Sequence, residues 1–127
     1  MATNDKLHQF GAYQKACELF DLVVAHIAPL ARDPLCMRLA SQQIASADSV
    51  SSNIEEGYGR ASRADYVRFL VIARGSATET RGRYEQRLKH WLPLDVIAAR
   101  VALCEEIVAI LSATIRRLRP GQRHSFR

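Results

Sequence analysis

The chain has 127 residues, of which 48% are apolar and 24% are charged, and its formal net charge at neutral pH is +5. This length and composition suit one globular domain that buries its own core. The sequence contains no apolar run of about 18 residues and begins without a signal-peptide pattern. We therefore expect a cytoplasmic protein with no membrane partner.

Charge is unevenly distributed along the sequence. Residues 60–91 carry eight basic and three acidic side chains, and residues 116–127 carry five arginines and no acidic residue. The rest of the chain is net negative. Segregation of this kind can create an anion-binding surface, although long surface helices also carry many arginines.

The three cysteines, Cys17, Cys36 and Cys104, are widely spaced and odd in number. We interpret them as small core residues in a reducing compartment, not as a disulfide set or a metal site. The four histidines show no ligand spacing. No metal or cofactor is predicted.

Three breaks divide the chain into four predicted helices, because proline disfavours a helical residue before it and glycine often ends a helix. The breaks are Arg32-Asp33-Pro34, Gly57-Tyr58-Gly59 and Leu92-Pro93-Leu94. The first helix is predicted over residues 13–31, where apolar residues recur at steps of three and four. The second is predicted over residues 35–56 and has mostly small inner positions, which allow close approach of a neighbouring helix. These positions are Ala40, Ile44, Ala47, Ser51 and Ile54.

The third predicted helix covers residues 63–91 and follows Ser62, a good N-cap, with Asp65 three residues later. Gly75 and Gly82 interrupt it, and each costs about 1 kcal/mol relative to alanine. Glycine inside a helix usually implies close packing or a bend, so we expect a tight helix contact at Gly75-Ser76. The predicted inward-facing residues are Tyr66, Phe69, Leu70, Ala73, Ala77, Thr80, Tyr84, Leu88 and Trp91.

The fourth predicted helix covers residues 95–118, with Asp95 as its N-cap, and residues 119–127 form a basic tail. A heptad-like seam runs along this helix: Ile97, Val101, Cys104, Val108, Leu111, Ile115 and Leu118. A second apolar stripe flanks the seam: Val96, Leu103, Ile107 and Ile110. We therefore expect this helix to contact a partner subunit as well as its own bundle. The four helices and their short connections predict an all-α, antiparallel up-down four-helix bundle over residues 1–127.

Three arginines of the third helix, Arg63, Arg74 and Arg81, lie within about 20° of one another at about 100° per residue. They form a stripe about 27 Å long at a rise of about 1.5 Å per residue. The stripe is a phosphate-contacting surface, a solvated helix face, or a set of ion pairs between subunits.

No catalytic signature occurs in the sequence. There is no phosphate-binding glycine loop after a strand, no nucleophile elbow and no Glu-x-x-His pair. Two pairs of glutamates are adjacent in sequence, Glu55-Glu56 and Glu105-Glu106. The two carboxylates of each pair therefore lie on different faces of their helix. We therefore predict a binding module and not an enzyme, with no catalytic residues.

The segment from Ser52 to Arg60 is the most unusual part of the sequence. Its short polar side chains can bond backbone groups that a helix end leaves unpaired. This segment is either a fixed corner between helices or a polar recognition surface.

The sequence resembles the four-helix intervening-sequence proteins, which are encoded within insertions in some bacterial large-subunit ribosomal RNA genes. The resemblance covers about residues 13–118. It is carried by Ser52-Asn53-Ile54-Glu55-Glu56-Gly57-Tyr58-Gly59-Arg60, then Asp65-Tyr66-Val67-Arg68-Phe69-Leu70, then Ala73-Arg74-Gly75-Ser76-x-x-Glu79. The motif residues are Ser52, Asn53, Glu56, Gly57, Gly59, Gly75, Ser76 and Glu79. The family is also similar to the accessory variability determinant protein of diversity-generating retroelements.

The resemblance implies a bundle that assembles into a ring-shaped homopentamer with a basic channel and binds nucleic acid without catalysis. The retroelement relative implies a reverse transcriptase and its RNA template as partners. This chain has Ile44-Ala45 where the family usually has a basic pair. It has Arg74 and Arg81 where leucine and glutamate are expected. Basic charge has therefore moved to the third helix.

We predict a homo-oligomer that contacts the backbone of RNA or of RNA–DNA. The predicted contact residues are Arg60, Arg63, Arg74, Arg81, Arg116, Arg117 and Arg119. Arginine suits phosphate because its fork can bind it bidentately. Since the aromatic residues of the third helix are expected to face the core, sequence specificity should be weak. The alternative is a protein–protein adaptor that docks a partner such as a reverse transcriptase.

Overall fold

The computed structural model describes the backbone of residues 2–119 and the side chains of residues 6–119. All regular secondary structure in this part of the chain is helical. In chain order the elements are α1 (Ala2–Gln9), α2 (Gly11–Ile27), the 3-10 helix η1 (Ala28–Arg32), α3 (Met37–Tyr58), α4 (Arg63–Gln86), the 3-10 helix η2 (Leu88–His90) and α5 (Leu94–Leu118).

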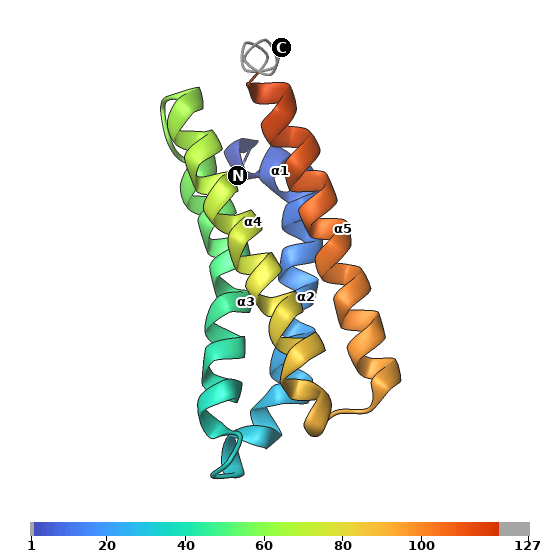
Figure 1. The fold of residues 1–127 in the computed structure, drawn as a ribbon. Helices are drawn as coiled ribbons and strands as arrows, with labels where there is room; N and C mark the ends of the chain where they lie inside the picture. Colours follow the sequence, from blue (N-terminus) through green and yellow to red (C-terminus); the bar gives the residue numbers. More distant parts are fainter. Residues whose placement is uncertain (1, 120–127) are drawn as a thin grey trace.

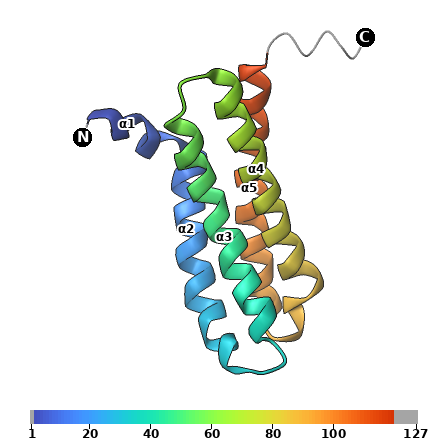
Figure 2. The same ribbon diagram turned by 90° about the vertical axis from the view of Figure 1, so that its left-hand side faces the viewer.

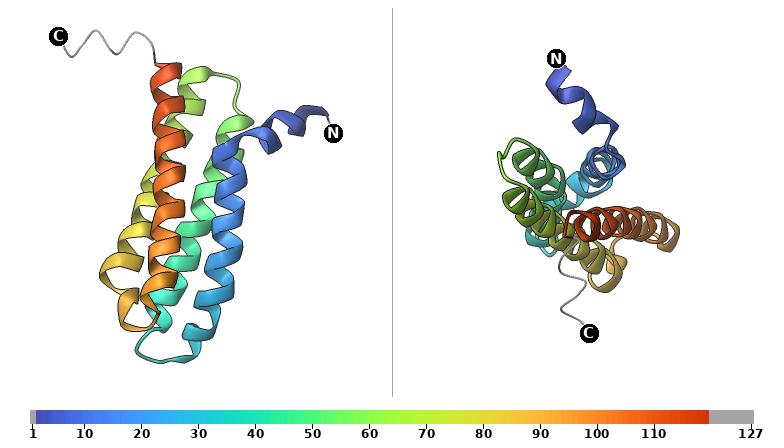
Figure 3. Two further views of the ribbon diagram at one scale, coloured as in Figure 1. Left: turned by 90° about the vertical axis from the view of Figure 1, so that its right-hand side faces the viewer. Right: turned by 90° about the horizontal axis from the view of Figure 1, so that it is seen from above.

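The four long helices, α2 to α5, form the antiparallel up-down bundle expected from the sequence (Figures 1 and 2). α3 packs against α2 and α4, and α5 packs against α4 and α2, which closes the bundle. α1 leaves the bundle sideways at the end that also holds the α3–α4 connection and the end of α5 (Figure 3). We call this the upper end. The lower end holds the α2–α3 and α4–α5 connections.

The interior of the bundle is filled by apolar side chains from all four long helices. Burial of one large apolar side chain stabilises the folded state by roughly 1.5–3 kcal/mol. Because α5 packs against both α2 and α4, it buries more than one stripe of residues. Leu103 and Ile107, which belong to the apolar stripe that flanks the predicted seam, therefore lie inside this chain's own core. The largest fully buried apolar side chains include Leu19, Ile27, Ile54, Leu70, Tyr84, Leu88, Ile107 and Leu111.

Helix ends differ from the sequence expectation at several places. The first predicted helix, 13–31, starts two residues earlier and ends as an α-helix at Ile27, then tightens into η1 with Pro29 in its first turn. The third, 63–91, ends at Gln86. Trp91 lies beyond η2, and its indole N–H donates to Asp33 Oδ2 at 3.1 Å, which joins the two lower-end connections. The short helix α1 was not predicted.

The two predicted N-caps have different outcomes. Ser62 caps α4 as expected, since its hydroxyl accepts the backbone N–H of Asp65 at 3.1 Å. Asp95 is not a cap, because α5 already begins at Leu94, directly after Pro93. Asp95 instead lies in the first turn, where a negative charge complements the helix dipole.

The close contact expected at Gly75 occurs at a different glycine. Gly75 is exposed, and an added Cβ there would meet no neighbouring atom within 4 Å. At Gly57, near the end of α3, an added Cβ would lie 2.8 Å from Phe69 Cβ and 3.1 Å from Tyr66 Cδ1. Gly57 therefore allows the start of α4 to approach α3 closely.

Candidate nucleic-acid interface

The arginines predicted to contact phosphate fall into two groups in the structure. Five lie at the upper end, in the α3–α4 connection, at the start of α4 and at the end of α5. These are Arg60, Arg63, Arg116, Arg117 and Arg119. Arg74 and Arg81 lie further along α4, beside α5. Residues 120–127 of the predicted basic tail lie outside the described residues.

The arginines in the middle of α4 already have polar partners. Arg81 pairs with Glu85 at 3.6 Å on its own helix and with Glu105 of α5 at 3.8 Å. Arg74 Nη1 donates to the hydroxyl of Ser112 at 3.3 Å. Arg63, Arg74 and Arg81 thus do not act as one uniform stripe, because α5 supplies partners for two of them.

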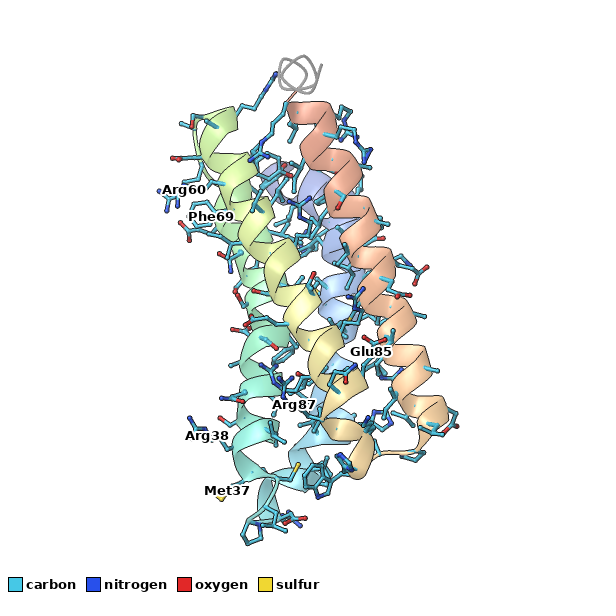
Figure 4. All side chains as sticks on the ribbon, viewed as in Figure 1. Met37, Arg38, Arg60, Phe69, Glu85 and Arg87 are labelled. Carbon is cyan, nitrogen blue, oxygen red and sulfur yellow. The ribbon has the colours of Figure 1, made fainter. Side chains whose placement is uncertain are left out.

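Arg60 and Arg68 share one aromatic ring, that of Phe69, which lies beside Arg60 at the upper end (Figure 4). Their guanidinium carbons lie 4.9 Å and 4.7 Å from the centre of the Phe69 ring, within the range of cation–π attraction. Arg60 also pairs with Glu56 at 2.6 Å, and Arg68 pairs with Asp65 at 3.5 Å. These contacts orient both arginines and neutralise part of their charge.

Three other upper-end arginines have more freedom to bind an external anion. Arg63, Arg116 and Arg117 are exposed, and none of them forms an ion pair with another described residue. Arg63 starts α4, and Arg116 and Arg117 occupy the last turn of α5. Antiparallel packing of α4 and α5 brings these two helix ends to the same end of the bundle (Figure 1).

Two adjoining hollows lie at this upper end. One, of about 250 Å³, is bounded by the α3–α4 connection, and the other, of about 400 Å³, extends toward α1. Tyr58, Tyr66 and Leu118 line both. The cations of their walls are Lys6, Arg60, Arg63 and Arg117, and none of the described residues in the walls is acidic.

Sequence reasoning missed Lys6, Tyr58 and Tyr66 as members of this surface. Tyr66 packs against the core as expected, and so does Tyr58, but each side chain is only half-buried and keeps part of its surface exposed. Both tyrosines lie where α3 ends and α4 begins, and both line the two hollows at the upper end. Lys6 belongs to α1, which the apolar periodicity did not predict.

The family motif residues of α3 and α4 meet in a polar seam between the two helices. Asn53 Nδ2 donates to the Ser49 carbonyl at 2.7 Å, and the Ser76 hydroxyl donates to the Ser49 hydroxyl at 2.8 Å. Further along, Gln43 Nε2 donates to the Thr80 carbonyl at 2.9 Å. Buried polar groups that are satisfied in this way hold the register of two helices.

Arg83 extends the seam at its solvent side. Its Nη1 donates to Gln43 Oε1 at 2.7 Å and to the Ser46 hydroxyl at 3.0 Å. Burial lowers the pKa of the Arg83 guanidinium, although arginine stays protonated in proteins. Glu79 lines the same shallow groove, which therefore combines both signs of charge.

The remaining motif residues close the corner between α3 and α4. Glu56 holds Arg60, Gly57 allows the close approach of α4, and the N–H of Gly59 donates to the Glu55 carbonyl at 3.3 Å. Ser52 is half-buried on α3. For Glu56, Gly57 and Gly59, these contacts favour the fixed corner of the two interpretations.

The cysteines and the acidic residues form no recognisable metal site in the described part of the chain. Cys36 and Cys104 are buried, Cys17 is half-buried, and all three thiols are free. Among residues with described side chains, no three His, Cys, Asp or Glu side chains are grouped so that they could hold a metal ion. No described helix has both the length and the apolar character needed to cross a bilayer.

Comparison with known proteins relates this bundle to one family. Residues 8–113 match the family described as 23S rRNA-intervening sequence protein. No curated protein matches the chain. The fold is similar to the crystal structure of a protein of unknown function from the S23 ribosomal protein family of Bacteroides thetaiotaomicron. That similarity has a TM-score of 0.77 at 24% identity and covers 83% of this chain and 98% of the other. Since the family match spans α2, α3, α4 and most of α5, the chain belongs to the 23S rRNA-intervening sequence protein family.

Proposed function

We propose that this protein is a non-catalytic nucleic-acid-binding protein that contacts the RNA backbone with the upper end of its bundle. The observation that supports the proposal is that four basic side chains line the two hollows, and that none of the described residues lining them is acidic. Arg63 and Arg117 are the strongest candidates, because they are exposed and without a described ion-pair partner. Family membership is consistent with an RNA ligand.

Arg74 and Arg81 have a smaller part in this proposal than the sequence suggested. A phosphate would have to compete with Glu85 and Glu105 for the guanidinium of Arg81. An exposed ion pair contributes little free energy, so this competition weakens the contact without abolishing it. Arg60 is similar, because Glu56 already holds it.

Fluorescence anisotropy with a labelled RNA oligonucleotide tests the proposal. Each phosphate contact that is lost makes the plot of log affinity against log salt shallower, by about 0.7 for single strands and about 0.9 for duplex DNA. The double variant Arg63→Gln with Arg117→Gln should therefore bind more weakly across all sequences and flatten the slope by roughly 1.4 on single strands. The helical signal and the assembly mass should not change.

Arg38→Gln with Arg87→Gln is the matched control, because it also removes two exposed arginines, at the lower end (Figure 4). Its affinity and salt slope should stay close to those of the unaltered protein. Arg81→Gln should have an intermediate effect. If the unaltered protein binds neither RNA nor DNA at about 50 mM salt, the function is wrong, since backbone contacts are strongest at low salt.

We further propose that the chain forms a homo-oligomer, as the ring-shaped pentamer of the family resemblance would imply. The exposed face of α5 carries small side chains at Ala98, Ala102, Ala109 and Ala113, which permit close approach of another helix. Symmetric assembly would repeat the basic upper end on every subunit. Light scattering at micromolar concentration should give a multiple of 14.3 kDa, and a mass of one chain would contradict the proposal.

The second candidate function is docking of a protein such as a reverse transcriptase of a retroelement. It is favoured by three large apolar side chains that are exposed near the lower end: Leu35 at 83%, Met37 at 54% and Leu94 at 77%. An RNA mobility-shift assay with and without a purified candidate partner separates the two functions. Binding that occurs only through the partner would support docking.

A further inference from the structure

The upper end contains a tyrosine pair that simple backbone binding does not use. Tyr58 is the last residue of α3, and Tyr66 lies in the first turn of α4. Each tyrosine lines both hollows and is half-buried, so each presents part of its surface to the solvent. Burial and the neighbouring Tyr58 raise the pKa of Tyr66, and the charge of Arg117, which lines the same larger hollow, acts in the opposite direction.

The glycine contact described above helps to position this pair. An added Cβ at Gly57 would lie 3.1 Å from Tyr66 Cδ1, so the Tyr66 ring packs closely over the end of α3. This packing fixes the position of the Tyr66 ring relative to the end of α3, which carries Tyr58. A preorganised aromatic surface loses little freedom when a flat ligand binds to it.

We propose that this end of the bundle binds single-stranded RNA, with unstacked nucleobases against Tyr58 and Tyr66. The adjoining phosphates would contact Lys6, Arg63 and Arg117, which line the same hollows. This inference rests on the proposed function and states which form of RNA the basic end selects. Because aromatic stacking tolerates every base, the selection concerns strandedness and not sequence.

The chemistry of the walls favours a single strand over a duplex. A nucleobase offers its flat face to tyrosine only when it is unstacked, as it is in loops and free ends but not inside a duplex. Stacking on one aromatic side chain changes affinity by roughly 5- to 150-fold per base, and a duplex forgoes that gain. The larger hollow, of about 400 Å³, lies within the range of roughly 300–1,000 Å³ typical of small-ligand sites.

A nucleic-acid occupant also fits this end better than a protein surface. A protein contact usually has an apolar centre with few charges. The four exposed large apolar residues of the described chain are Leu35, Met37, Ile72 and Leu94. None of them lines either hollow, and the walls combine two tyrosines, Phe10 and Leu118 with four cations, which is more charge than the centre of a protein contact usually holds.

Anisotropy titrations of the full chain with a 12-nucleotide single-stranded RNA and a 12-base-pair RNA duplex test the inference. Tyr58→Leu and Tyr66→Leu keep an apolar side chain but remove the ring. Each should weaken single-strand binding by about 5- to 150-fold and leave duplex binding unchanged. Tyr66→Phe keeps the ring and should bind within about twofold of the unaltered protein. Circular dichroism checks that each variant is folded.

Photocrosslinking of the unaltered protein gives a result that does not depend on any variant. A single-stranded RNA that carries 5-iodouridine should crosslink to Tyr58 or Tyr66, as mapped by mass spectrometry. Trp91 is the internal control, because it is a partly exposed aromatic residue that joins the two connections at the lower end. Crosslinks at Trp91 with none at Tyr58 or Tyr66 would overturn the inference.

The outcomes separate this inference from the proposed function. If RNA binds and depends on Arg63 and Arg117, but single strands show no preference and the leucine variants bind normally, backbone binding stands and the tyrosine site is wrong. That result would point to a protein as the occupant of the hollows. If no RNA or DNA binds at about 50 mM salt, both proposals fail together.

Discussion

Replacement of Gly57 by alanine tests the packing that sets the upper end. The new Cβ would lie 2.8 Å from Phe69 Cβ, an atom fixed to the α4 backbone, and 3.3 Å from the Tyr66 carbonyl oxygen. α4 must therefore shift away from α3, and overpacking of this kind costs about 1–3 kcal/mol. Alanine in a helix regains up to about 1 kcal/mol relative to glycine. The net loss of stability should be about 1 kcal/mol, and could reach about 2 kcal/mol.

Gly75→Ala is the matched control on α4, because it makes the same chemical change where no neighbouring atom lies within 4 Å. Only the helix preference acts there, so this variant should gain up to about 1 kcal/mol. For a chain of this length, 1 kcal/mol corresponds to a shift of about 4 °C in Tm. Thermal melts followed by circular dichroism should thus give shifts of opposite sign, at equal protein concentration because assembly affects Tm. A Gly57→Ala variant that melts higher, as Gly75→Ala should, would refute the close contact.

Three further predictions concern a cap, a buried hydrogen bond and a buried thiol. Ser62→Ala removes the acceptor of the Asp65 N–H and should lower the free energy of unfolding by about 1 kcal/mol in a urea titration. Gln43→Leu removes the acceptor that binds Arg83 at 2.7 Å and the donor that binds the Thr80 carbonyl at 2.9 Å, so the same titration should show a loss of about 1–3 kcal/mol. No loss would mean that solvent replaces both bonds. Burial raises the pKa of the Cys104 thiol to about 12, so the folded state keeps a proton that the unfolded chain loses near pH 9. Its stabilising contribution is complete below about pH 9 and is lost as pH rises toward 12, by up to about 1.4 kcal/mol per pH unit. Between about pH 8 and pH 10.5, the free energy of unfolding should fall more for the unaltered protein than for Cys104→Ala. An equal fall in the two proteins would contradict a raised pKa at Cys104.

The nucleic-acid surface shows where reasoning along one helix stops. The angular spacing of Arg63, Arg74 and Arg81 follows from helix geometry alone. Whether each arginine is available depends on α5, which brings Glu105 to Arg81 and Ser112 to Arg74. No property of the α4 sequence indicates those neighbours, because they come from residues more than twenty positions away.

The tyrosines illustrate a second limit of periodicity. Tyr66 falls on the apolar face of its helix, and that pattern predicted a core position. The apolar pattern predicts which side of the helix faces the core, but not where along the helix axis the bundle ends. Tyr66 lies in the first turn of α4, beside the last residue of α3, Tyr58, and at this end of the bundle its side chain is only half-buried.

What the sequence determined by itself was local in origin. Repeats of three and four residues defined four amphipathic helices, and the side chain at Ser62 identified one helix start, since both effects act within a few residues. The tertiary structure decided the features that depend on the register between helices. It brought Gly57 against Phe69, left Gly75 in solvent, and gathered the ends of α3, α4 and α5 around two hollows. Those contacts join segments far apart in the chain, and only the packing of complete helices sets the distance between them.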